Sequence, residues 1–332
     1  SVDMILKNLE SANSFDDFLE WMKKLSDIVT DHRCLWNILH TEVQPSLKVT
    51  LEQSRQLAAK FFSPEMLFEF GVESFLASEL ADFSNIKTED DIIDMFYAAV
   101  GFIRSCNLAA NYEINDQGFI DFVKQLLTNF PQIPDFDAHQ FVWLIESIQD
   151  HMHIPQSVLK PICESVVTEY VKQPIKNDAF SRLYKMCIIS TSPFLQQISM
   201  LQNSINLVFK NVLKEQRKFV HKYIFGSYVH IIWDNGDLKD QKTHKKLEVD
   251  DDEIEDFTRP SDPLYEWKLY ITNLARRVKS KSELPVMLII DCVNDSLDFF
   301  TAYYSEVQPL KNNSAKLRID IFKLVTTIKE VY

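Results

Sequence analysis

The sequence predicts an all-α protein, an irregular, HEAT-like α-solenoid of about 12–14 stacked antiparallel helices with little or no sheet. Three observations support this class: glycine is scarce, apolar residues recur at helical spacing, and prolines mark short connections. Only 5 glycines occur in 332 residues, against an average usage of about 7%. Turns between strands and phosphate-binding loops consume glycine, because a residue without Cβ tolerates positive φ and close backbone approach. The chain is therefore predicted to lack nucleotide-binding loops and most β-hairpins.

Helix starts are indicated by capping residues. Ser-Pro or Asp-Pro pairs stand at 63–64, 192–193 and 262–263, and each places a capping oxygen before a proline at the first helical position, where the missing N–H is not needed. Thr88 and Asp91 have the spacing of a capping box. These pairs predict helices that begin at or just after each of these positions.

Apolar residues behind these caps recur on one helical face. After Thr88 this face comprises Ile92, Ile93, Phe96, Ala99, Val100 and Ile103. Similar seams run through 194–212, 286–304 and 317–331. The apolar run 286–290 alone would also suit a buried strand, but its continuation in helical register favours a helix.

Prolines divide the chain into segments of helical length. Connections are predicted at Pro45, Pro64, Pro131 to Pro134, Pro155, Pro174, Pro193, Pro263 and Pro285. Residues 234–262 differ from the rest, with a turn signal at 234–237 and then 11 acidic and 5 basic residues across the whole segment. The predicted organisation is a helical block at 1–233, an acidic and disordered loop at 234–262, and further helices at 263–332 that pack on the same solenoid.

Charge and cysteine content limit the function classes. A formal net charge of -13 disfavours a general nucleic-acid binder, because phosphates need a basic surface. The 5 cysteines contain no CxxC pair and are interpreted as buried thiols of a reducing compartment. The sequence contains neither a signal peptide nor a long apolar span. It predicts a nuclear or cytosolic protein, with the nucleus favoured, that is neither secreted nor embedded in a membrane.

Phenylalanine, with 24 residues, is concentrated where a partner could bind. The candidate partner-binding residues are Phe61, Phe62, Phe68, Phe70 and Phe75. Apolar residues cover nearly the whole circumference of the helix predicted after Pro64, so this helix is either central in a large core or covered by another chain. Gly71 would let it approach a second helix closely.

A basic stripe is the second candidate site. Lys210, Lys214, Arg217, Lys218 and Lys222 recur at spacings of three and four, on one face of a predicted helix. Such a stripe can contact phosphate or an acidic partner, or it can be a solvated face. The sequence leaves these alternatives open.

Catalytic, cofactor and metal sites are not predicted. His151 and His153 are two positions apart and point away from each other on a helix, so they cannot converge on one ion and are assigned a structural or surface role. No local signature of a nucleophile with its base is present. The segment with Leu247 and Val249, followed by acidic residues, weakly matches a SUMO-interacting motif, although an ordinary acidic loop explains it better.

The chain resembles the helical regulatory and recruitment subunits of structural-maintenance-of-chromosomes complexes. The resemblance covers the whole length and consists of scarce glycine, abundant Phe and Leu, Ser-Pro and Asp-Pro caps and an acidic loop. It implies a non-enzymatic nuclear subunit that binds a second helical subunit and helps a genome-maintenance complex to reach its site of action. A scaffold or adaptor is therefore the leading hypothesis, a nucleic-acid-associated subunit using the basic stripe is the alternative, and an enzyme without a recognisable motif is third.

Overall fold

The structure is a computed structural model that describes residues 1–176, 179–220, 231–234, 237–240, 262–279, 286–306 and 314–331. These residues form 14 α-helices and one pair of short strands. The predicted all-α class is confirmed, whereas the solenoid arrangement of the whole chain stays a prediction. None of the described helices is both long and apolar enough to cross a membrane. Contacts divide the chain into two compact units, Ser1–Val166 and Val167–Tyr332.

The first unit holds eight helices and most of a ninth. Its helices are α1 (Val2–Ser11), α2 (Phe15–Ile28), α3 (His32–Thr41), α4 (Leu51–Phe61), α5 (Pro64–Ala77), α6 (Glu89–Ser105), α7 (Gln117–Asn129), α8 (Ala138–His151) and the first part of α9 (Gln156–Lys172). Short 3-10 turns occupy Glu79–Ala81, Phe83–Asn85 and Phe130–Gln132. The capping oxygens predicted at Ser63 and Thr88 accept hydrogen bonds from Met66 N and Asp91 N, so both predicted helix starts are confirmed.

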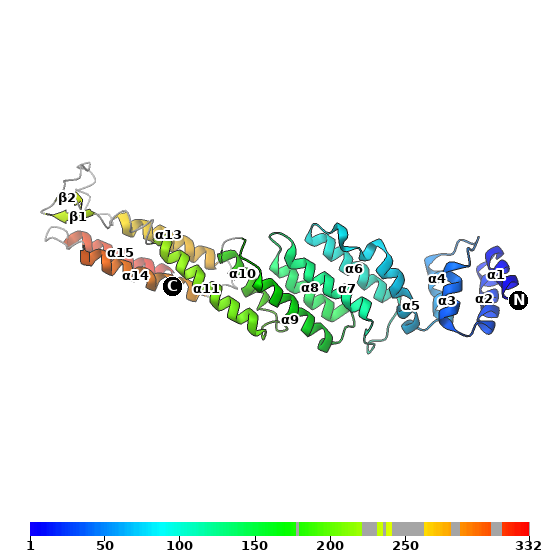
Figure 1. The fold of residues 1–332 in the computed structure, drawn as a ribbon. Helices are drawn as coiled ribbons and strands as arrows, with labels where there is room; N and C mark the ends of the chain where they lie inside the picture. Colours follow the sequence, from blue (N-terminus) through cyan, green and yellow to red (C-terminus); the bar gives the residue numbers. More distant parts are fainter. Residues whose placement is uncertain are drawn as a thin grey trace. The chain divides into compact units, whose positions relative to one another are not determined.

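Two apolar cores meet at α5. The first lies among α1 to α4 and includes Leu9, Met22 and Leu25, which are fully buried. The second lies among α5 to α8, where α6, α7 and α8 lie side by side (Figure 1). Because Phe70 belongs to the first core and Phe68 packs in the second, α5 is buried on opposite faces. This explains why its sequence is apolar nearly all the way round.

Gly71 allows α5 to approach α6. A Cβ added at Gly71 would lie 3.0 Å from Cε2 of Phe102 on α6, which is closer than two carbon atoms pack without strain. The close approach predicted for this glycine is confirmed. Gly101 differs, because a Cβ added there would have no neighbour within 4 Å.

The second unit is also helical. It contains the end of α9, α10 (Ala179–Ile189), α11 (Ser199–Phe219), α13 (Asp262–Lys279), α14 (Met287–Glu306) and α15 (Ser314–Val331). Helix α11 contacts α10 and α14, and α13 contacts α14 and α15 (Figure 1). The apolar run 286–290 enters α14, so the helical alternative is confirmed.

A short hairpin stands at the start of the predicted acidic loop. Strands β1 (Ile231–Asp234) and β2 (Asp237–Asp240) pair antiparallel, with Asp234 opposite Asp237. Two residues separate them, as expected for the turn signal at 234–237. Residues 237–240 are thus a strand where a disordered loop was predicted, and 241–261 lie outside the described residues.

Two boundaries differ from those predicted. The helix predicted from Ser192 makes one turn and stops, because Ile198 leaves the helical region with ψ 109 while Leu195 and Ile198 become buried. Helix α11 therefore begins at Ser199. The two units also divide inside α9, between Val166 and Val167, rather than at the acidic segment. Since α11 contacts α14, that segment interrupts one packed unit and does not separate two.

Candidate functional site

The phenylalanines predicted to bind a partner are buried in the chain itself. Phe62, Phe68, Phe70 and Phe75 are buried, and Phe61 is half-buried against the first core. Phe68 lies 5.5 Å from Phe119 between ring centroids, and Phe75 stacks on Phe102 at 5.1 Å. The placement of a partner surface on these residues is therefore corrected: Phe68, Phe70 and Phe75 pack in cores of their own unit. The face of α5 that is left exposed carries Glu65, Glu69 and Glu73 instead.

A different aromatic group is exposed on the same unit. Tyr97 on α6 and Trp143 on α8, here called the aromatic pair, are 56% and 38% exposed. Their ring centroids are 6.1 Å apart, and their planes are inclined by 51°. Within the described part of the chain, neither the Tyr97 hydroxyl nor the Trp143 indole N–H has a hydrogen-bond partner. Large aromatic side chains with an apolar body and an unused polar tip are typical of protein interfaces.

The core beneath fixes the position of the aromatic pair. Phe96 is buried and lies 5.4 Å from Tyr97 and 5.7 Å from Trp143 between ring centroids. The contact with Trp143 is edge-to-face, with an interplanar angle of 77°, an arrangement that aromatic rings prefer. The pair is therefore held from below by a ring that cannot move without disturbing the core.

The two helices that carry the aromatic pair are tied together at their starts. In the capping box of α6, Asp91 N donates to Thr88 Oγ1 at 3.3 Å, and Thr88 N donates to the Asp91 carboxylate at 2.8 Å. These hydrogen bonds lower the pKa of Asp91, with a further N–H from Lys87 as the largest cause. The N–H of Asp137, the N-cap of α8, donates to the carboxylate of Glu89 in the first turn of α6. Helices α6 and α8 thus run in the same direction, which brings Tyr97 and Trp143 to the same level.

The sequence indicates the aromatic pair through two large aromatic residues that fall outside the apolar face of their helices. Tyr97 follows Phe96 and falls outside the buried face of α6. Trp143 likewise falls outside the buried face of α8, between Val142 and Leu144. Large aromatics off the buried face are candidates for binding, but only the register of α6 against α8 shows that these two meet.

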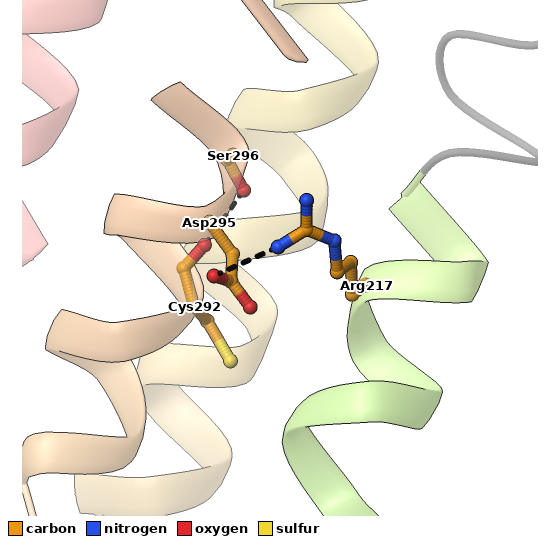
Figure 2. A network of polar contacts seen from close by, with 4 residues as sticks. All are labelled: Arg217, Cys292, Asp295 and Ser296. Carbon is orange, nitrogen blue, oxygen red and sulfur yellow. Dashed lines mark hydrogen bonds and ion pairs between the residues drawn. The ribbon is translucent and has the colours of Figure 1, made fainter. Parts of the chain in front are cut away.

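The basic stripe predicted on α11 is partly free and partly engaged. Lys210, Lys214 and Lys218 are exposed on one face of α11, whereas Lys222 lies outside the described residues. Figure 2 shows Arg217 turned toward Asp295 on α14. Its guanidinium lies 3.3 Å from the Asp295 carboxylate. Exposed lysines can meet phosphate or carboxylate groups, so the alternatives left open by the sequence stay open for these three.

Next to this ion pair is a buried thiol. Cys292 on α14 is buried, and burial raises the pKa of its thiol to about 12. Its carbonyl oxygen accepts a hydrogen bond from Ser296 Oγ at 2.7 Å (Figure 2). A thiol with such a pKa carries almost no thiolate at neutral pH, so it is a poor nucleophile.

A groove of about 390 Å³ lies between α11 and α13. Two of its polar groups bond to each other: the Tyr270 hydroxyl donates to Gln216 Oε1 at 2.6 Å. The Tyr270 ring stacks on Phe219 with centroids 5.4 Å apart. Burial also raises the pKa of Tyr270. These contacts stabilise the packing of α13 on α11.

Three further thiols, those of Cys34, Cys106 and Cys163, differ in exposure, but each has a raised pKa. Burial raises the pKa of Cys106 to about 11 and that of Cys163 to about 12. The prediction that all cysteines are buried is wrong for Cys34, which is exposed in the first turn of α3. A side-chain hydrogen bond with Asp31 raises its pKa as well. None of the thiols of Cys34, Cys106, Cys163 and Cys292 is activated as a nucleophile.

His153 has a structural role. It adopts a left-handed backbone conformation with φ 51 at the end of α8, its carbonyl accepts a hydrogen bond from Ile114 N at 2.8 Å, and its ring nitrogen Nδ1 lies 3.2 Å from Tyr112 O. These contacts attach the loop before α7 to the end of α8, in agreement with the structural or surface role predicted for His153. Among the described residues, no three metal-ligating side chains lie together. Leu247 and Val249 lie outside the described residues.

Comparison of the chain with protein-family models, with curated proteins and with solved structures gave no match.

Proposed function

We propose that this chain is a non-enzymatic scaffold or adaptor subunit that binds another protein through the aromatic pair on unit 1. The proposal rests on the exposure of Tyr97 and Trp143 above a rigid core. An interface gains most of its affinity from a few such aromatic side chains, which lose little conformational entropy on binding. The raised pKa values of the thiols favour a binding role over nucleophilic catalysis.

The nature of the assembly is part of the proposal. The resemblance to regulatory subunits of structural-maintenance-of-chromosomes complexes suggests a helical partner subunit and a nuclear, genome-maintenance setting. In this role the chain needs no cofactor, because its contribution is to hold a partner and to bring it to a larger machine.

Removing the aromatic pair is expected to abolish partner binding without unfolding the chain. Substituting both Tyr97→Ala and Trp143→Ala removes two exposed side chains, and the loss of one hot-spot residue weakens association by roughly 2 kcal/mol or more. The measurement is affinity purification of wild-type and variant chains from cells, with quantitative mass spectrometry of what co-purifies.

The matched control is the variant with Leu51→Ala and Leu80→Ala. Both leucines are exposed on the same unit, but neither belongs to the aromatic pair. A protein lost with the aromatic variant and retained with the leucine variant identifies the partner. If both variants retain the same proteins as the wild type, the aromatic pair is not a binding site.

The alternative function is association with nucleic acid through Lys210, Lys214 and Lys218. It is favoured by the exposure of all three on one face of α11, and it concerns a surface of the second unit. Changing the three lysines to glutamate is expected to weaken DNA or RNA binding and to flatten its dependence on salt, because each phosphate contact contributes to that slope.

Fluorescence anisotropy with a labelled duplex and a labelled single strand, at two or more salt concentrations, measures this effect. The control is Lys23→Glu with Lys24→Glu, which changes two lysines on α2. If the wild-type chain binds neither probe, or if the control variant loses as much binding as the stripe variant, this alternative is excluded.

A further inference from the structure

The surface around the aromatic pair is acidic. Asp94 lies three residues before Tyr97 on α6, and Glu146 lies three residues after Trp143 on α8, so each carboxylate flanks its ring on the same side of the helix. Both residues are exposed. Within the described residues, neither carboxylate takes part in a hydrogen bond or an ion pair. Asp150, a further turn along α8, is also exposed.

Positive charge is sparse on this surface. Arg104 is exposed two turns beyond Tyr97, in the last turn of α6, where a cation offsets the negative end of the helix dipole. Arg104 is the only lysine or arginine on α6 and α8, whereas the two helices expose the carboxylates of Asp94, Glu146 and Asp150. An anionic partner such as a phosphate backbone or an acidic lipid would be repelled here.

The geometry of the two rings suits a cation. A lysine or arginine side chain is attracted to the face of an aromatic ring when it lies within about 6 Å of the ring centroid, and tryptophan is the strongest partner. The rings of Tyr97 and Trp143 are both exposed and their centroids are 6.1 Å apart, so a cationic group bound on this surface can lie within about 6 Å of both rings. The neighbouring carboxylates would then accept hydrogen bonds from its N–H groups.

From these observations we propose that the aromatic pair, with Asp94 and Glu146, docks a lysine- or arginine-bearing segment of a separate partner protein. This inference rests on the proposed function, since it names the chemistry of the partner bound at the same site. The cation lies on the exposed surface of the Tyr97 and Trp143 rings, its aliphatic stem covers the apolar ring surface, and the two carboxylates compensate its charge.

The test uses labelled peptides with the full chain. The probes are three synthetic peptides of equal length, in which glycine alternates with arginine, lysine or glutamate, and binding is followed by fluorescence anisotropy. We expect the arginine and lysine peptides to bind and the glutamate peptide not to bind. Raising the salt concentration should weaken binding, because exposed charges are screened.

Two variants distinguish binding at the aromatic pair from the general attraction of an acidic chain for a basic peptide. Tyr97→Ala with Trp143→Ala is expected to weaken binding of the arginine peptide at least roughly tenfold, as the loss of a contact of the order of 1.4 kcal/mol requires. Asp94→Asn with Glu146→Gln should weaken it by roughly three- to tenfold and reduce its salt dependence. The control, Glu52→Gln with Glu65→Gln, removes the same charge from α4 and α5 and should have no comparable effect.

The outcomes distinguish this inference from the proposed function. If the peptides bind the aromatic variant as tightly as the wild type, attraction is nonspecific and the inference is wrong. If the cellular partner is lost with the aromatic variant but retained with the carboxylate variant, the proposed function stands and the basic character of the partner is wrong. Sedimentation velocity tests whether a second copy of this chain occupies the site. Self-association that is abolished both by the aromatic variant and by the variant with Lys210→Glu, Lys214→Glu and Lys218→Glu would show this and would contradict the proposal.

Discussion

Replacing Phe68 with alanine is expected to lower the free energy of unfolding by about 3–5 kcal/mol, the usual result of cutting a core phenylalanine to alanine. Phe68 is 1% exposed and its ring meets those of Phe102, Tyr112 and Phe119. The variant removes all three ring contacts and leaves a cavity between α5, α6 and α7. A urea titration followed by circular dichroism should show the transition of the first unit shifted by roughly 1 M or more.

Tyr97→Ala is the matched control for this prediction. Tyr97 is also an aromatic residue of the first unit, but its side chain is mostly exposed, so its loss should cost roughly 0.5–1 kcal/mol. Phe68→Ala should therefore impair folding and Tyr97→Ala should impair association. A Phe68→Ala variant that unfolds like the wild type but loses its partner would restore the partner surface first predicted on α5.

Helical periodicity and caps are local, and for this reason much of the fold could be predicted. The buried face of α6 consists of Ile92, Phe96, Ala99, Val100 and Ile103 together with Met95, nearly the set that the spacing indicates. The capping box of Thr88 depends on a residue three positions away. Such features require no knowledge of the other helices.

Interactions between distant helices could not be predicted in the same way. The nearly continuous apolar surface of α5 is compatible with burial by its own chain or by a partner, and the second core that covers Phe68 includes Phe119, 51 residues further along the chain. The contact between Tyr97 and Trp143 could not be predicted for the same reason, because these residues meet only through the register of α6 against α8. The early end of the helical turn at Ser192 also depends on burial of Leu195 and Ile198, which the cap at 192–193 does not indicate.

A buried arginine gives the second prediction. Arg182 on α10 is 9% exposed, and its guanidinium donates to the carbonyl oxygens of Tyr170 at 2.8 Å, Gln173 at 2.9 Å and Pro174 at 3.1 Å. It also lies 4.5 Å from the centroid of the Tyr170 ring. Carbonyl groups at the end of a helix have no partner within that helix. Arg182 donates hydrogen bonds to carbonyl oxygens at the end of α9 and thereby attaches this end to α10.

Arg182→Ala is expected to lower the free energy of unfolding of the second unit by roughly 2–4 kcal/mol, because a hydrogen bond to a charged group contributes about 1.5–3 kcal/mol and the carbonyl groups of Gln173 and Pro174 would lose this donor. The Tyr170 carbonyl would keep the hydrogen bond that it accepts from Gln173 N at 3.1 Å. Arg182→Lys should lie between the alanine variant and the wild type, since an ammonium group keeps the charge but cannot reproduce the planar fork that reaches three carbonyl oxygens. The measurement is urea unfolding, together with hydrogen exchange of the amides at the end of α9.

The control for this series is Arg276→Ala, which removes an exposed arginine from the last turn of α13 in the same unit. A cation in that position contributes only about 0.3–1 kcal/mol through the helix dipole. Hydrogen exchange at the end of α9 should accelerate with Arg182→Ala and stay unchanged with Arg276→Ala. If Arg182→Lys is as stable as the wild type, charge alone suffices and the fork of hydrogen bonds is not what holds α9 to α10. Arg182→Ala could instead leave both the unfolding midpoint and the hydrogen exchange at the end of α9 unchanged. In that case water replaces the guanidinium as the donor to the carbonyl groups, and the burial of Tyr170 and its apolar neighbours holds the end of α9.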